Sequence, residues 1–155
     1  HDSDKQLVDI VRDVCKYLDW GDFESLSALL ADEIVVTSPL GVFEGMQEVR
    51  DRITSDPLVG KHTTAIDSGP SVEAGSKEGE EPYVVKALLT GKIKPTVWNM
   101  MAATQHISQT VEICKKSMKV LRIVRELPSA ETFGAISIQL ILSERALRLG
   151  AKELR

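Results

Sequence analysis

The sequence predicts an α+β domain in which three helices are followed by a strongly curved antiparallel sheet. Two observations favour this class. Apolar residues recur at helical spacing in the first part of the chain, and β-branched runs separated by proline and glycine follow as far as residue 127. Helices that cover one face of such a sheet leave a cavity beneath them, so we expect a cone-shaped domain with a pocket.

Length and composition agree with one compact domain. The chain has 155 residues, of which 43% are hydrophobic and 27% are charged, and both values are ordinary for globular proteins. The net charge is −4 with acids and bases interspersed, which argues against the clustered basic surface that nucleic-acid binding needs. No apolar run reaches the ~18 residues of a membrane span, and no secretory signal is visible, so we expect a cytoplasmic protein that does not bind membranes.

The first helix is predicted over residues 5–20. Its apolar side chains recur at the i, i+3, i+4, i+7 spacing of a core-facing side; they are Leu7, Ile10, Val11, Val14 and Leu18. Gly21 ends this helix and Asp22 is a good N-cap for the next. We expect the second helix to run as far as Asp32, because Phe23, Leu26, Leu29 and Leu30 fall at helical spacing.

The next elements are a strand and a third helix. Residues 34–37 form a β-branched run that predicts a strand, and Pro39 and Gly41 end it with a turn. The third helix follows Gly45. It ends before Pro57, because the residue before a proline avoids the helical region.

The remainder of the body reads as strands. A bend at residues 68–70 either ends the first of them or lets it resume over 71–74, and a polar loop at 75–81 follows. The last strand is apolar on both faces, which is typical of a central strand that is covered on both sides. The predicted strands are residues 61–66, 82–93, 96–114 and 118–127.

Residues 128–155 form a C-terminal extension with apolar side chains at roughly helical spacing. We therefore divide the chain into a domain at 1–127 and an extension at 128–155. Two arrangements of the extension stay open: it packs on the domain or a sheet edge, or it covers the pocket or reaches a partner subunit.

No pattern for metal, cofactor or disulfide chemistry is present. The sequence has no His-x-His, no His-x-x-x-His, no cysteine pair at ligand spacing, no glycine-rich phosphate loop and no nucleophile elbow. Two cysteines, Cys15 and Cys114, are too few for a disulfide framework. We expect both to be buried small hydrophobic residues in a reducing compartment.

Residues 17–53 resemble the opening of the nuclear transport factor 2-like superfamily, and most closely its SnoaL-like cyclases and ketosteroid-isomerase-like proteins. The resemblance is carried by Gly21-Asp22, residues 28–32, residues 38–41, and Glu44-Gly45 with the helix behind them. It extends to residue 55, and beyond that only the order of elements agrees. It implies a cone-shaped fold with a pocket for a small apolar molecule and a homodimer formed through the sheet.

The resemblance argues against steroid isomerisation. The isomerases carry a carboxylate immediately before the strand-end proline as a proton acceptor, and a tyrosine in the first helix as a donor to the oxyanion. The corresponding positions here hold Ser38 and Val14, the latter eight residues before Asp22. A serine needs an adjacent base before it can be useful near neutral pH.

The SnoaL-like cyclases and related dehydratases typically use a histidine and a carboxylate in the same cavity. His62 is a candidate because dehydratase-like relatives have a histidine near this point, although it could instead cap a strand or meet solvent. His106, in the strand at 96–114, could act as acid or base if it faces the cavity; otherwise it is a partly exposed sheet residue. Asp67 could orient a histidine.

The candidate catalytic residues are therefore His62, His106 and Ser38. Five further residues could line the pocket, with ordinary core packing as the alternative; they are Trp20, Val14, Tyr83, Trp98 and Met100. Two functions stay open: a pocket protein that binds, or as a metal-free enzyme isomerises, cyclises or dehydrates, a small apolar molecule, and a non-catalytic dimeric interaction module.

Overall fold

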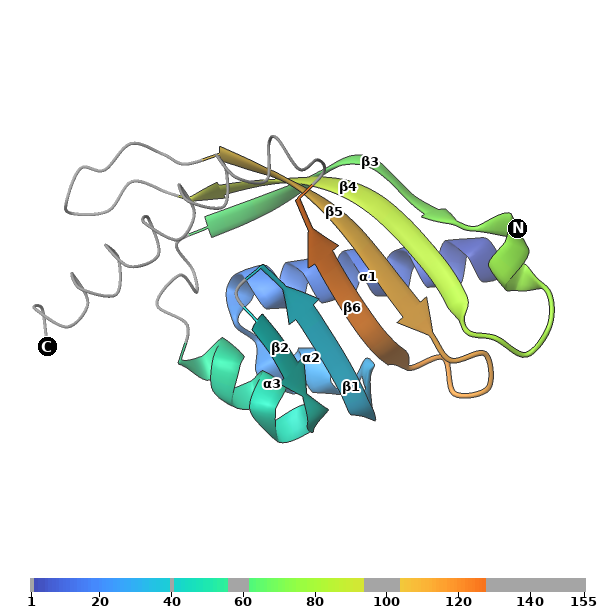
Figure 1. Cartoon of the computed structure of the whole chain (residues 1–155), viewed down its shortest axis with the longest axis horizontal. Coiled ribbons are helices and arrows are strands. Elements are labelled where there is room, and N and C mark those ends of the chain that lie inside the picture. Colours follow the sequence, from blue (N-terminus) through green and yellow to red (C-terminus); the bar gives the residue numbers. More distant parts are fainter. Residues whose placement is uncertain (1, 40, 56–61, 94–103, 128–155) are drawn as a thin grey trace, which may run out of the picture.

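The computed structural model describes residues 2–39, 41–55, 62–93 and 104–127 (Figure 1). Within these ranges the chain forms three α-helices, one short 3-10 helix and six strands, which confirms the α+β class. The helices are α1 (Asp2–Trp20), α2 (Phe23–Ser27), α3 (Gly45–Thr54) and the 3-10 helix η1 (Ala74–Lys77). The strands are β1 (Leu30–Ser38), β2 (Gly41–Glu44), β3 (His62–Val72), β4 (Tyr83–Ile93), β5 (Thr104–Ile113) and β6 (Val120–Glu126).

The six strands form one sheet in the order β2-β1-β6-β5-β4-β3. All neighbouring pairs are antiparallel except β1 and β6, which run parallel. The prediction of a purely antiparallel sheet is therefore wrong at this pair. The reason is topological: the chain builds β2 to β5 before β6 returns beside β1, and strands joined by so long a connection can lie parallel.

Helix α1 covers one face of the sheet, which we call the inner face; the opposite face is the outer face (Figure 1). Its side chains at Leu7, Val11 and Val14 are completely buried against the sheet. The far end of α1 is anchored to β3, because the backbone N–H and the hydroxyl of Thr64 donate to the Asp19 carboxylate at 2.8 and 2.7 Å. This contact and the apolar core hold the helix in place over the strands.

Side chains alternate between the two faces along the central strands, as β geometry requires. The buried side chains at alternate positions face inward. They are Val85, Ala87 and Leu89 on β4, Gln109, Val111 and Ile113 on β5, and Ile123 and Leu127 at β6. The intervening residues, such as Leu88 and Ser108, lie on the outer face and pair across β4 and β5. The sheet register therefore determines which side chains can meet beneath α1.

The second helix is shorter than predicted. It begins after the Asp22 N-cap, whose Oδ1 accepts from the Ser25 N–H at 3.1 Å, but it ends at Ser27 rather than at Asp32. The hydrogen bonds from Ser25 also hold the pKa of the Asp22 carboxyl below its ordinary value. The Val120 N–H donates to the Leu29 carbonyl at 2.8 Å. Pairing with β6 therefore uses a carbonyl group that a longer helix would need for its own hydrogen bonds.

Strand β3 continues through the bend predicted at residues 68–70 and ends at Val72. The pairing with β4 shifts on both sides of Ser68, as at a β-bulge. Gly69 has φ of +84°, and a Cβ atom there would lie 2.8 Å from the Lys86 carbonyl oxygen. Only glycine allows the two backbones to approach so closely at this point. Gly69, which in the sequence suggests the end of a strand, therefore lies within one.

Other elements begin earlier than predicted: α1 starts at Asp2 instead of residue 5, and β1 starts at Leu30 instead of residue 34. The short strand β2 was not predicted. The predicted strands at 82–93 and 118–127 correspond to β4 and β6. The described part of the long predicted strand is β5, which ends at Ile113, one residue earlier than predicted. Residues 94–103, with Trp98 and Met100, and the predicted extension at 128–155 lie outside the described residues. No helix within the described ranges has the length and apolar character needed to cross a membrane.

The alternation on β4 can be tested with two neighbouring leucines. Leu89 is 1% exposed on the inner face, and Leu88 is 50% exposed on the outer face. Leu89→Ala should lower the free energy of unfolding by about 2–5 kcal/mol because it leaves a cavity. Leu88→Ala should change it by about 0.5 kcal/mol or less. Urea unfolding of both variants measures the difference, and equal losses would contradict the assignment of the two faces.

Candidate functional site

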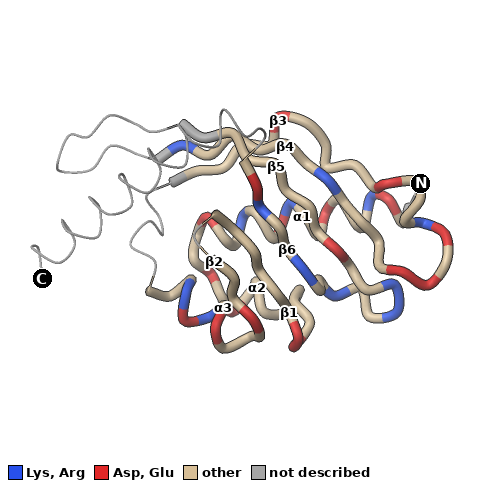
Figure 2. Tube along the Cα trace, in the orientation of Figure 1, with Lys and Arg blue, Asp and Glu red and all other residues tan. Residues whose placement is uncertain are grey.

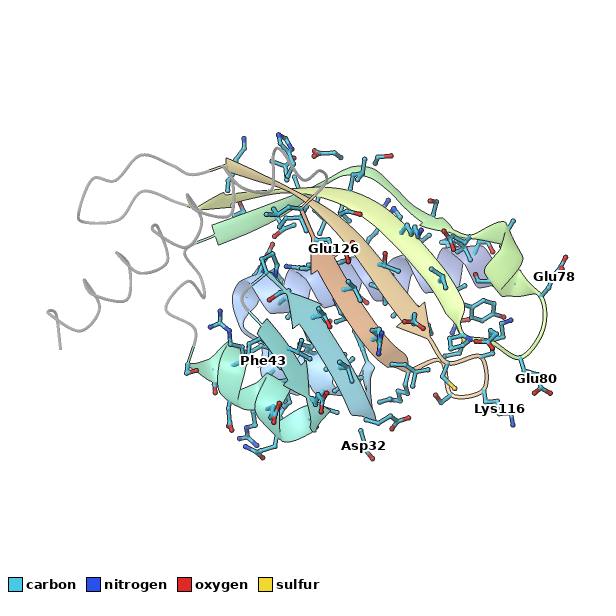
Figure 3. The ribbon with its side chains drawn as sticks, in the orientation of Figure 1. Asp32, Phe43, Glu78, Glu80, Lys116 and Glu126 are labelled. Atoms are coloured by element: carbon cyan, nitrogen blue, oxygen red, sulfur yellow. The ribbon has the colours of Figure 1, made fainter. Side chains whose placement is uncertain are left out.

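Three polar side chains interrupt the apolar inner face at one level of the sheet. Gln109 on β5 pairs with Arg125 on β6. The parallel pairing of Val36 with Ile123 places Ser38, two residues further along β1, level with Arg125. We call Ser38, Arg125 and Gln109 the inner polar row. Arg125 precedes Glu126, which is labelled at the end of β6 in Figure 3.

Gln109 is at the β5 end of the inner polar row, next to Arg125. It is the one fully buried polar side chain among the described residues, with 0% of its surface exposed. Its Oε1 accepts a hydrogen bond from Arg125 Nε at 2.9 Å, and its Nε2 donates to Cys15 Sγ on α1 at 3.5 Å. The amide therefore fixes Arg125 on one side and the helix on the other.

Arg125 is left with donors to spare. Its Nη2 atom is buried and has no hydrogen-bond partner within the described part of the chain, and no ion pair to Arg125 is formed there. It is also the only charged side chain at an inner-face position of the described strands. A buried donor without a partner typically costs about 1–3 kcal/mol. The site therefore holds a cationic donor at the inner face that has no partner among the described residues.

The remaining predicted pocket residues fall in different places. Val14 is completely buried in the core under α1, and Tyr83 at the start of β4 packs against the same core. Trp20, at the end of α1, is 63% exposed, with its ring edge-on to Tyr17 at 6.4 Å between centroids. The structure thus brings Val14 and Tyr83 to the inner side and places Trp20 at the surface.

His106 lies on the outer face. It pairs with Thr90 across β4 and β5, and its neighbour Ile107 packs inward. The Thr90 hydroxyl is 3.3 Å from His106 Nδ1 and donates to the Asp67 carboxylate, so Asp67 reaches the histidine through a threonine. This exposed cluster is on the opposite side of the sheet from the inner polar row, and the condition that His106 faces the cavity is not met.

His62 begins β3 opposite Ile93, and its side chain lies outside what the structure describes. Among the residues that are described, no group of three His, Cys, Asp or Glu side chains is arranged to hold a metal ion. The inner polar row contains no carboxylate and no imidazole. Its chemistry is that of hydrogen-bond donors and one positive charge, without a general base for proton abstraction.

The two cysteines differ. Cys15 is buried, as predicted, and contacts Gln109. Cys114 was predicted to be buried in a strand, but it is partly exposed at the turn after β5. Hydrogen bonds from Ser117, followed by one from the Lys116 backbone, lower the pKa of its thiol. The prediction fails because the strand ends one residue earlier.

Gln109 and Arg125 were missed by the sequence analysis. The signal was present, since Gln109 is a polar residue within the apolar alternation of Ile107, Val111 and Ile113. Arg125 was not recognised as a site residue because its strand was predicted to be apolar on both faces. Charged residues of both signs are spread over helices and strands (Figure 2), so charge alone does not single it out.

Solved structures with the same architecture identify the fold. A nuclear transport factor 2-like superfamily protein from Salmonella enterica serovar Typhimurium superposes with a TM-score of 0.63 at 13% identity, over 81% of this chain and 90% of that one. The chain has the nuclear transport factor 2-like fold. This confirms the resemblance found in residues 17–53. Searches with the sequence against family models and curated proteins find no match.

Other structures with this fold differ in their described roles. The CaMKII hub of S. rosetta has a TM-score of 0.66 at 15% identity, over 80% of this chain and 95% of that one. An LEH-like epoxide hydrolase of M. tuberculosis has a TM-score of 0.61 at 12% identity, over 91% and 96%. At such identities the likeness shows the nuclear transport factor 2-like fold and leaves the chemistry open.

The contact between Gln109 and Arg125 predicts a rescue. Gln109→Leu should lower the free energy of unfolding by about 1–3 kcal/mol, because it leaves Arg125 Nε without its acceptor in a buried place. Adding Arg125→Met should recover most of this loss, since the unpaired cation is removed as well. Chemical denaturation of the single and double variants gives the coupling.

The matched control is Arg122→Met in the Gln109→Leu background. Arg122 is on the same strand, but it is exposed and lies near Glu112 at 3.7 Å. This substitution should recover nothing. Equal recovery by the two arginine substitutions would show that Gln109 and Arg125 are not coupled.

Proposed function

We propose that this protein binds a small, largely apolar molecule between the helices and the inner face, with the inner polar row as its polar anchor. The observation that carries the proposal is the pair of Gln109, which is fully buried, and Arg125, whose buried Nη2 has no partner among the described residues. Ligand sites typically combine apolar walls with a few placed polar groups.

The proposed activity is binding, with catalysis as an extension that needs a further residue. Ser38 is the inner-row residue at the position where the isomerases carry their proton acceptor, and a serine does not replace a carboxylate as a base. Isomerase, cyclase or dehydratase chemistry would require a base from elsewhere. His62 is the remaining histidine candidate, because His106 is on the outer face.

Native mass spectrometry tests the binding proposal. We expect the purified protein to carry a small-molecule adduct, or to bind the neutral apolar probe 2-naphthylmethanol saturably. Ser38→Phe, which puts a ring into the inner polar row, should reduce binding at least tenfold by filling space. Ser108→Phe places the same ring on the outer face and should leave binding within twofold. Neither an adduct nor probe binding in the wild type would reject the proposal.

A second function, a dimeric interaction module, is favoured by one feature of the outer face. Leu88 is a large apolar side chain that is 50% exposed at the middle of β4. The CaMKII hub and the association domain of C. elegans CaMKII, which has a TM-score of 0.63 at 18% identity, have this fold. An exposed apolar residue in the centre of a sheet suits contact with a second copy.

The same spectrometer tests this alternative through the mass of the assembly. A homodimer formed through the sheet should dissociate in Leu88→Glu, because a charge would be buried without a partner. Val42→Glu changes a similarly exposed residue on the edge strand β2 and should leave the dimer intact. A monomeric wild type, or a dimer unaffected by Leu88→Glu, would count against an interface on this part of the sheet.

A further inference from the structure

We propose that the molecule bound at the inner face carries a carboxylate, and that Arg125 binds it through the terminal nitrogens of its guanidinium group. The ligand class is thus an amphipathic monocarboxylate with an apolar body. This inference rests on the binding function proposed above and adds the chemistry of the ligand's polar end.

The first step of the argument is the orientation of Arg125. A guanidinium group has five N–H donors in one plane. One of them, on Nε, is used by Gln109, and Gln109 is itself held by Cys15 on α1. The guanidinium group is therefore positioned before any ligand arrives, and its Nη2 atom has no partner within the described ranges. A positioned donor loses less entropy on binding than a mobile side chain does.

The second step concerns charge. Several exposed basic side chains of the described residues have acidic neighbours: Lys86 contacts Glu73 at 2.7 Å, and Arg122 lies 3.7 Å from Glu112. Arg125 makes no such pair within the described residues, although its Nη2 is buried. Burying a cation is unfavourable unless an anion and hydrogen bonds compensate it. The missing partner is an anion with at least one acceptor oxygen.

The third step selects the kind of anion. A carboxylate carries one negative charge and two oxygens in the planar geometry that a guanidinium group binds with two parallel hydrogen bonds. A phosphate monoester would bring close to a second negative charge. No second basic side chain occupies an inner-face position of the described strands, so one carboxylate matches the charge of the site.

The fourth step gives the rest of the molecule. Toward one end of their strands, Gln109 and Arg125 are followed on the inner face by Val111 and Ile123, which the core already covers at 0% and 1% exposed. Toward the other end lie Ile107 and Leu127, where the ligand would extend. These side chains offer no hydrogen bonds. The part of the ligand that extends from the carboxylate must therefore be apolar, because polar groups left without partners against these residues would lose their hydration.

The experiment compares two probes of nearly equal shape, 2-naphthoate and 2-naphthylmethanol, by isothermal titration of the full chain. The wild type should bind naphthoate at least tenfold more tightly than naphthylmethanol. Arg125→Gln should weaken naphthoate at least tenfold and abolish most of the preference for naphthoate, leaving the two affinities within about twofold of each other. Arg125→Lys keeps the charge but loses the planar donor pair, so its affinity for naphthoate should lie between those of the wild type and Arg125→Gln.

The control is Arg122→Gln, which removes the same charge from the outer face of the same strand and should change neither affinity. Circular dichroism and thermal unfolding check that each variant is folded. Equal affinity of the wild type for both probes, or a naphthoate affinity unchanged in Arg125→Gln, would overturn the carboxylate assignment and leave the binding function standing. Failure of both probes to bind would instead reject the binding function.

A carboxylate supplied by the chain itself is the other source to distinguish. Residues 128–155 include Glu131, Glu144 and Glu153. If one of these neutralised Arg125, naphthoate would compete with a tethered carboxylate and would bind no better than naphthylmethanol. That result would overturn the inference of a carboxylate ligand.

Discussion

The packing of α1 on the inner face is the constraint on which the rest of the structure depends. Its side chains at Leu7, Val11 and Val14 are completely buried and cover one face of the sheet with apolar groups. Asp19 accepts hydrogen bonds from Thr64 and so holds the far end of the helix on β3. Once the inner face is fixed, alternation along each strand determines whether a strand side chain lies on the inner or the outer face. Cys15 then places a sulfur atom beside Gln109, so the same helix that forms the core also supports the polar anchor.

Alternation places polar residues that are close together on one strand on opposite faces of the sheet. On β5, His106 lies on the outer face and Gln109 on the inner face; on β6, Arg122 lies outside and Arg125 inside. A shift of one residue in the register of either strand would exchange these environments. The candidate site is therefore a consequence of register, which places His106 on the outer face and Gln109 and Arg125 on the inner face.

The sequence predicted those parts of the fold that local patterns determine. The apolar side of α1, the Asp22 cap and the spans of β4 and β6 follow from spacing and turn chemistry. The short α2 and the parallel pairing of β1 with β6 did not, because both depend on strands far apart in the chain meeting at Leu29 and Val120. The site was harder still. Recognising Gln109 and Arg125 as partners required the pairing of β5 with β6, which no local pattern contains.

In this chain the inner face separates stability from polar chemistry. Its stability comes from apolar residues on α1 and on the strands around the polar row, so the polar positions can change without loss of the core. Arg125 illustrates the reverse case. A buried donor without a partner lowers stability, and a methionine of similar length would fill the same space without that cost. A fully buried amide holds this arginine in place although the apolar core does not require it, and the proposed ligand would supply the partner that its Nη2 lacks among the described residues.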